Sequence, residues 1–138
     1  MNISFIAASH RENSQSKRIA EIIESRLKIF DKLIKTAVID LASSNLPFWS
    51  PEKKKGKGVW SDTWKNISKT LANSSGFVLV VPEYGGMATP QAKNFFLLCD
   101  KGELAHKPGL IVSVSSGNGG AYPITELRSS SYKNTHIM

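Results

Sequence analysis

The chain has 138 residues, of which 41% are hydrophobic and 21% are charged, and 18 lysines and arginines against 11 acidic residues give it a formal net charge of +7. This length fits one domain over residues 1–138, and the composition excludes a disordered, collagen-like or membrane-spanning chain. One cysteine excludes an internal disulfide, and the first residues lack the zones of a secretory signal, so the cytoplasm is the expected compartment. The positive charge favours an anionic partner, whether nucleic acid, a membrane surface or a phosphorylated small molecule.

Short apolar runs alternate with amphipathic segments in the first part of the chain. Strands are predicted over 3–8 and 37–41, and the run FVLVV at 77–81 is the strongest strand signal because it is uninterrupted and mostly β-branched. Apolar residues spaced by three and four predict helices over 15–30 and about 61–73.

The same alternation continues in the second part. The apolar positions of 92–99 predict a helix, 110–114 a strand, and about 124–131 a further helix, while a fifth strand would open at 135–138. Strands that alternate with helices predict an α/β domain with a mostly parallel sheet and right-handed crossovers.

Ligands of such folds bind beyond the carboxyl ends of the strands, where this chain carries three loops rich in Ser, Gly or Asn, at 9–16, 82–88 and 115–121. The first loop places hydroxyl groups and Arg11 at the start of a helix, whose free N–H groups and dipole favour a phosphate monoester. The alternative is an ordinary helix cap beside a solvated arginine. No G-x-x-x-x-G-K-[ST] is present, which excludes a Walker loop.

The residues of the other two loops indicate a ligand less specifically. Two glycines in the second loop let the backbone approach a flat ligand with Tyr84 beside it, but a plain turn with a surface tyrosine explains the same residues equally well. The segment SSGNGG at 115–120 offers free amide groups. A dinucleotide-binding fingerprint is rejected there, because that motif follows the first strand and this segment follows the fourth.

Several other chemistries find no support. Three scattered histidines and one cysteine have no metal-ligand spacing, so no metal site is expected, and no G-x-S-x-G elbow is present. Cys99 lies on an apolar helical face and is predicted to be a buried structural thiol. The cluster of Lys53, Lys54, Lys55 and Lys57 is predicted to be a solvated segment, with phosphate steering as the alternative, and its lack of interleaved aromatic residues argues against nucleic-acid binding.

Taken together, the three loops resemble those of the NADPH-dependent FMN reductase family, in the same order and through nearly the whole chain. The family's Gly-Ser-x-Arg-x-x-Ser-x-Asn/Ser pattern resembles residues 8–16 here, with Ala8 in place of the glycine. Its Leu-Pro-aromatic segment resembles 46–48. Its Pro-Glu-Tyr-Asn segment resembles 82–85, with Gly85 in place of the asparagine, and its Lys-Asn pair matches Lys93 and Asn94.

The resemblance implies a flavodoxin-like three-layer sandwich whose parallel sheet has the strand order 2-1-3-4-5, with the last strand and the final helix truncated in this chain. It also implies an FMN-dependent oxidoreductase that takes a hydride from NADPH or NADH. The acceptor would be a small molecule, namely a quinone, an azo compound, a metal oxyanion or free flavin. A homodimer or homotetramer is implied, with the helix at 93–99 near the interface.

By the same resemblance, FMN would be bound by four residues around its phosphate and by nine around its ring system. The phosphate residues are Ser9, Arg11, Ser14 and Ser16, and the others are Pro82, Glu83, Tyr84, Gly85, Gly86, Ser115, Ser116, Gly117 and Gly120. No catalytic residue is named, because the flavin carries the chemistry.

Two other hypotheses remain open. One is a flavodoxin-like electron carrier or flavin-binding module without turnover, although such carriers tend to be acidic and this chain is basic. The other is a truncated paralogue that binds no flavin. Without a final helix, one face of the sheet near the fourth strand would expose apolar surface that a partner subunit would cover.

Overall fold

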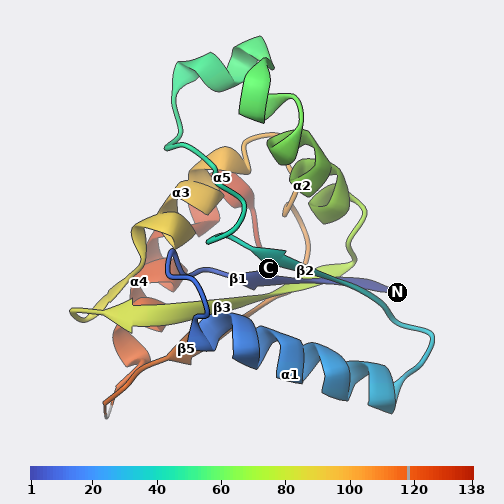
Figure 1. Ribbon diagram of the computed structural model, residues 1–138, viewed down its shortest axis with the longest axis vertical. Helices are drawn as coiled ribbons and strands as arrows, with labels where there is room; N and C mark the ends of the chain where they lie inside the picture. The colour runs from blue at the N-terminus through green and yellow to red at the C-terminus, as the bar shows by residue number, and fades with distance from the viewer. Residues whose placement is uncertain (118) are drawn as a thin grey trace.

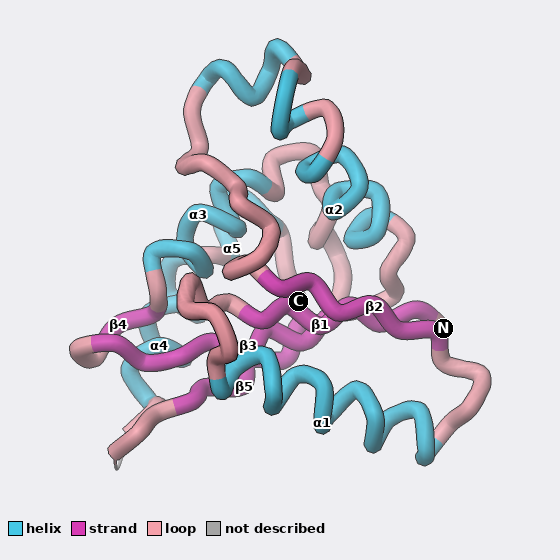
Figure 2. Tube along the Cα trace, viewed as in Figure 1, coloured by secondary structure: helices cyan, strands magenta, loops and turns pink. Residues whose placement is uncertain are grey.

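A computed structural model of the chain describes residues 1–117 and 119–138. Its strands are β1 (Asn2–Ala7), β2 (Lys35–Asp40), β3 (Gly76–Tyr84), β4 (Met87–Ala88) and β5 (Gly109–Val114). The four long strands pair in parallel in the order β2-β1-β3-β5, and β4 runs antiparallel to the carboxyl end of β3 (Figure 2). This order confirms the flavodoxin-like α/β fold.

Helices cover both faces of the sheet, which gives three layers (Figure 1). One face carries α1 (Gln15–Phe30) alone, and the other carries the remaining helices. These are α2 (Thr63–Ala72), α3 (Pro90–Leu98), α4 (Ala121–Ser130), the short α5 (Tyr132–Thr135) and the 3-10 helices η1 (Pro51–Lys55) and η2 (Gly58–Trp60). The sequence locates α1 correctly at both ends, whereas α4 begins three residues earlier than predicted.

The central strand β3 explains why two cores form. Its alternate residues Phe77, Leu79 and Val81 pack in the core beneath α2, α3 and α4, whereas Val78 and Val80 pack on the α1 side. Successive side chains of a strand point to opposite faces. A run without polar residues therefore indicates a strand that is buried on both sides, as the sequence predicted.

The lysine cluster is solvated at three of its four positions, as predicted, but not at Lys53. Lys53 is buried: its ammonium forms a salt bridge with Asp100, donates to the carbonyl of Leu98 at 2.6 Å and lies 5.1 Å from the ring centroid of Trp64. The prediction is thus wrong for Lys53. Folding brings this residue next to α2 and the end of α3, where the carbonyl of Leu98 and the carboxylate of Asp100 accept from its ammonium. The other three lysines of the cluster are exposed.

A fifth strand over 135–138 is also not formed, since Thr135 ends α5 and His136 adopts a left-handed backbone with φ 51°. The last residue of the chain nevertheless pairs with the backbone at the start of β5, where a fifth parallel strand would lie. Met138 donates to the carbonyl of Lys107 and accepts from the N–H of Gly109, both at 3.0 Å, which is the hydrogen-bond pattern of a parallel ladder.

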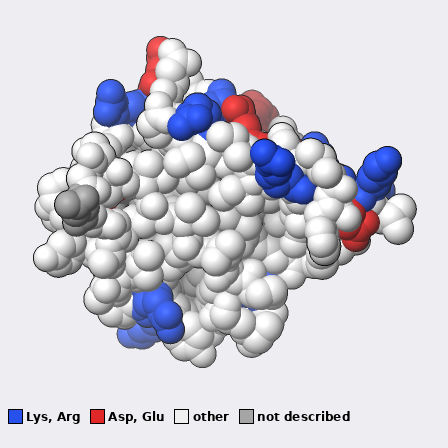
Figure 3. Space-filling model, turned by 90° about the horizontal axis from the view of Figure 1, so that it is seen from below, with Lys and Arg blue, Asp and Glu red and all other residues white. Residues whose placement is uncertain are grey.

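The outer side of β5 is apolar and open. Leu110 is 56% exposed, and a groove of about 500 Å³ runs between β5, α4 and the last residues. Viewed from the α1 side, the molecule presents a broad uncharged area with lysines and arginines near its rim (Figure 3). The exposure agrees with the sequence-based expectation, and coverage by a partner subunit stays a prediction. Among the described residues, no helix has both the length and the apolar character needed to cross a membrane.

Candidate functional site

The three loops singled out in the sequence meet at the carboxyl edge of the sheet, where side chains tie them together. The hydroxyl of Ser9, in the first loop, lies 3.2 Å from the hydroxyl of Tyr84 in the second. Ser9 is fully buried and also accepts from the N–H of Arg11 at 3.1 Å. The position of Tyr84 is therefore coupled to the path of the backbone before α1.

A second link joins the β3-β4 hairpin to the third loop. The carboxylate of Glu83 accepts a hydrogen bond from the N–H of Gly120, and a Cβ at Gly119 would approach the same carboxylate to 3.1 Å. Because this contact occupies a carboxylate oxygen, Glu83 positions the third loop. A side chain at Gly119 would crowd this carboxylate, and the φ of 91° at Gly120 favours glycine.

The second loop is a tight hairpin turn. Gly85 and Gly86 have φ values of 58° and 76° and connect Tyr84 to Met87 across the antiparallel pair. Positive φ at both central residues is typical of a type I′ turn. The glycines thus have a structural role in the turn, while the ring of Tyr84 packs edge-on against His10 with 5.4 Å between centroids.

The first loop carries features that fit an anion at the start of α1. Ser14 caps the helix by accepting from the N–H of Lys17 at 3.2 Å, and the first turn contains no acidic residue. Arg11 is exposed and forms no salt bridge within residues 1–117 and 119–138. The partial positive charge of the helix end is therefore not neutralised by a nearby carboxylate of α1.

Ser16 supplies the most specific observation in this loop. It is 1% exposed, and its hydroxyl finds no hydrogen-bond partner in the described part of the chain. A buried hydroxyl without a partner costs roughly 1–3 kcal/mol, so an acceptor at this position stabilises the protein. The oxygens of a phosphate monoester are such acceptors, and the residues present fit the phosphate end of FMN.

The third loop is more open. Ser115 is half-buried and its hydroxyl accepts from the N–H of Gly117 at 3.3 Å, whereas Ser116 and Gly117 are exposed. Asn118 lies outside the described residues. A Cβ at Gly117 would meet no atom within 4 Å, so the backbone is not closely packed at that residue.

Three further residues shape the site and were not predicted to do so from residue chemistry. Thr89 is fully buried, caps α3 and donates to the carbonyl of Ala8, which joins the start of α3 to the first loop. A Thr-Pro pair at a helix start is the sequence signal that would have revealed the role of Thr89.

Asn94 donates to the carbonyl of Pro47 at 3.0 Å and accepts from the N–H of Trp49 at 2.7 Å, so it fixes the Leu-Pro-aromatic segment.

Glu126 of α4 holds the far strand of the hairpin. It accepts from the N–H of Ala88 at 2.7 Å and forms a salt bridge with Lys93. The hydrogen bond from Lys93, followed by that from Ala88, lowers the pKa of Glu126 below its ordinary value. No sequence motif indicated this residue, because its partners lie about 30 or more positions earlier.

Cys99 is fully buried, and this burial raises the pKa of its thiol well above the ordinary value. The sequence-based interpretation as a structural thiol is confirmed. A high pKa leaves little thiolate, so Cys99 is not placed to act as a nucleophile.

The architecture and the joined loops define a flavodoxin-like α/β protein whose serine- and glycine-rich loops gather at one edge of the sheet. The profile of the NADPH-dependent FMN reductase family matches residues 1–137, and the chain belongs to this family of oxidoreductases. No curated protein sequence matches the chain significantly.

Solved structures with the same fold include several flavin enzymes. The apo form of an NADH:FMN oxidoreductase is similar with a TM-score of 0.78 and 16% identity, over 99% of this chain and 70% of that one. An oxidoreductase from Corynebacterium diphtheriae has a TM-score of 0.77 and 17% identity, over 99% and 76% of the two chains. An azoreductase from Bacillus anthracis has a TM-score of 0.72 and 12% identity, over 99% and 82%. At these identities the likeness shows the fold.

Proposed function

We propose that the protein binds FMN at the three joined loops and acts as an NAD(P)H-dependent oxidoreductase. When bound, FMN would accept a hydride from NADPH or NADH and reduce a small acceptor, namely a quinone, an azo compound, a metal oxyanion or free flavin. The observation that carries the proposal is the unpartnered, buried hydroxyl of Ser16 at the start of α1, in a chain of this family.

The first loop would hold the phosphate. The O–H groups of Ser14 and Ser16 donate, the guanidinium of Arg11 supplies charge, and the first N–H groups of α1 point outward from the helix. Ser9 is bonded within the protein and keeps the loop in position. Charge-assisted hydrogen bonds of this kind contribute about 1.5–3 kcal/mol each.

The other two loops would flank the ring system. The segment from Pro82 to Gly86 presents backbone and the Tyr84 side chain, and Ser115, Ser116, Gly117 and Gly120 lie on the facing loop. Because Glu83 and Tyr84 are each bonded to a neighbouring loop, the three parts are held together before a ligand arrives. Such preorganisation lowers the entropy cost of binding.

The test is a double substitution, Arg11→Ala with Ser14→Ala, in which FMN binding is followed by absorbance and flavin fluorescence. We expect the dissociation constant to rise at least tenfold, about 1.4 kcal/mol. The matched control is Ser25→Ala with Arg26→Ala, an exposed pair further along α1. Unchanged affinity in the first variant would rule out this loop as the phosphate site.

Turnover is tested separately with FMN-loaded protein, by following NADPH and NADH oxidation in the presence of a quinone. Steady-state oxidation supports the oxidoreductase. Bound FMN without turnover would instead support a flavin-binding module. The homodimer or homotetramer stays a prediction, which light scattering of the same sample tests.

A further inference from the structure

A second cavity lies away from the three loops, and the proposed flavin chemistry does not use it. It has a volume of about 300 Å³ and lies between η1, η2, the start of α2 and the residues after α3. Its charged and aromatic lining consists mainly of Lys53, Lys54, Lys65, Lys101, Trp60 and Trp64. We propose that this cavity binds a small aromatic phosphate, of the class of a nucleoside monophosphate, independently of FMN.

The net charge of the lining favours an anionic ligand. Four lysines face one carboxylate, that of Asp100, and this carboxylate is already paired with Lys53. Lys54, Lys65 and Lys101 form no salt bridge in the part of the chain that the structure describes.

Three other acids lie near the cavity, and among the described residues none forms a salt bridge with Lys54, Lys65 or Lys101. Asp62 accepts from the hydroxyl of Ser61, which lines the cavity. Glu52 pairs with Lys55 on the outer side of η1, and the buried Glu103 accepts from the hydroxyl of Ser68 and the backbone N–H of Lys101. The ammonium groups of Lys54, Lys65 and Lys101 outnumber the unpaired carboxylates of Asp62 and Glu103, so the hollow has a net positive potential. A phosphate group neutralises such a cluster, because lysine binds phosphate as a point charge.

The aromatic part of the lining favours a ligand with a ring. Trp64 is 5% exposed and the ammonium of Lys53 lies over its ring, so it forms a fixed wall of the cavity and Trp60 is the indole that can stack. Trp60 is half-buried and packs against the core from η2, which leaves part of its indole on the cavity. Indole faces stack on nucleobases and on other flat rings.

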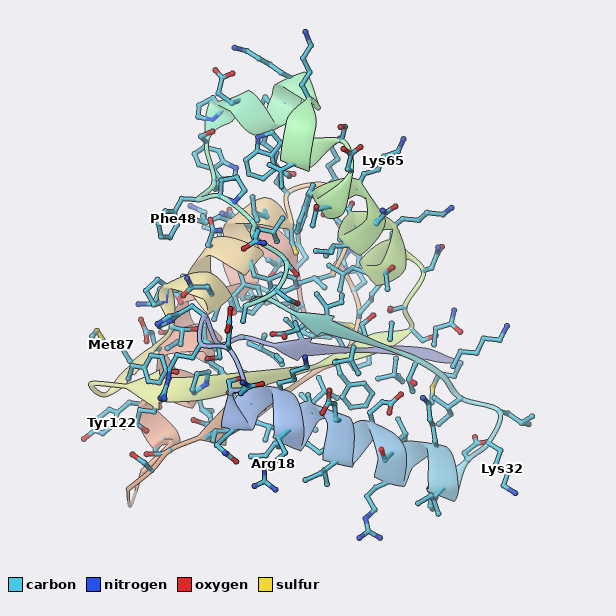
Figure 4. All side chains as sticks on the ribbon, viewed as in Figure 1. Arg18, Lys32, Phe48, Lys65, Met87 and Tyr122 are labelled. Carbon is cyan, nitrogen blue, oxygen red and sulfur yellow. The ribbon has the colours of Figure 1, made fainter. Side chains whose placement is uncertain are left out.

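The size and the position of the cavity fit a small ligand that is separate from FMN. The volume lies at the small end of the range for small-molecule sites, and therefore suits a mononucleotide better than a dinucleotide. Lys65 at the start of α2 lies far in Figure 4 from Met87 and Tyr122, which mark the hairpin and the start of α4. A ligand here would not contact the proposed flavin loops.

The experiment uses the indole N–H signals of the ¹⁵N-labelled protein during titration with AMP, both with and without saturating FMN. The chain has three tryptophans, and Trp49 does not line the cavity, so it serves as an internal reference. We expect AMP to shift the signals of Trp60 and Trp64, to leave that of Trp49 in place, and to do so whether or not FMN is present. Failure of FMN binding alone would therefore leave this proposal intact.

Matched variants distinguish a site from general attraction. Lys54→Ala, Lys65→Ala and Lys101→Ala together should weaken AMP binding at least tenfold. The control, Lys32→Ala, Lys69→Ala and Lys133→Ala, removes the same charge from exposed positions outside the cavity lining and should change it less than twofold. Equal losses in the two variants, or unshifted Trp60 and Trp64 signals, would overturn the proposal.

Three further ligands test its chemical class. Adenosine and inorganic phosphate should each bind at least tenfold more weakly than AMP, because each lacks one of the two groups. Equal binding of either would show that the cavity does not select an aromatic phosphate. An oligoadenylate that binds more tightly than AMP would assign the surface to nucleic acid instead.

Discussion

The hydroxyl of Ser9 lies 3.2 Å from that of Tyr84, a residue 75 positions later, and this pair links the loop before α1 to the β3-β4 hairpin. Neither residue needs to contact a substrate for the link to matter. It makes the shape of the proposed phosphate loop depend on the hairpin, so a substitution at either residue affects both loops.

Tyr84→Phe should therefore weaken FMN binding although it leaves the aromatic ring in place. The substitution removes one hydrogen bond to the buried Ser9, worth about 1 kcal/mol, and frees the first loop to move. FMN titration and urea unfolding measure the two effects. Tyr122→Phe, at an exposed tyrosine, is the control and should change neither. An FMN affinity equal to that of the wild type would show that the link does not support the site.

Glu83→Ala should destabilise the fold more than Glu83→Gln. Alanine leaves the buried N–H of Gly120 without an acceptor, which costs roughly 1–3 kcal/mol, whereas the amide oxygen of glutamine still accepts. The free energy of unfolding from urea titration gives the comparison. If both variants lost the same stability, the carboxylate charge and not the hydrogen bond would be the important term.

Gly86→Ala should cost about 1–2 kcal/mol, because its φ of 76° is unfavourable for a residue with a Cβ. A Cβ there meets no atom within 4 Å, so steric contact adds nothing. Gly86→Asn is the matched control, since asparagine tolerates the left-handed region, and it should retain most of the stability. Thermal unfolding of the three proteins measures the order, and an alanine variant as stable as wild type would contradict the turn assignment.

The stabilisation from Glu126 should depend on pH. Its pKa is lower in the folded protein than in the unfolded chain, so its contribution is complete above the ordinary glutamate value, about 4.3, and is lost as the pH falls through the lowered pKa. Glu126→Gln should therefore show a smaller loss of stability between neutral and acidic pH than the wild type. Urea midpoints across this range test the sign, with the exposed Glu21→Gln as a control that keeps the wild-type slope.

Cys99 should resist thiol reagents in the folded state and react fully in denaturant. Burial blocks access and also raises the pKa of the thiol, so two independent effects suppress its reactivity. Mass spectrometry after timed alkylation at pH 8 gives the measurement. Rapid modification of the native protein would mean that the end of α3 opens readily.

Local patterns in the sequence were enough to locate most elements. The spacing of Ile19, Ile23 and Leu27 defined α1, and the continuous run from Phe77 to Val81 defined the central strand, because both signals depend on neighbouring positions only. The three loops were likewise placed at one edge by the rule for parallel sheets, and the structure brings them together there.

What the sequence did not reveal depends on contacts between distant positions. Lys53 was predicted to be solvated because it lies in a segment rich in Pro and Gly, and its partner Asp100 is reached only through folding. The same applies to Glu126, which bonds Ala88 from a different helix, and to Asn94, which anchors Pro47. No pattern within one segment identifies such pairs.

The two backbone hydrogen bonds of Met138 have a practical consequence for handling the protein. Residues fused after Met138 would begin beside Gly109 and be guided along the open edge of β5, into the apolar groove next to Leu110. An affinity tag or reporter placed there would cover that edge and disturb the measurement of the oligomeric state by light scattering. Such a handle therefore belongs at the amino terminus, where Met1 is exposed.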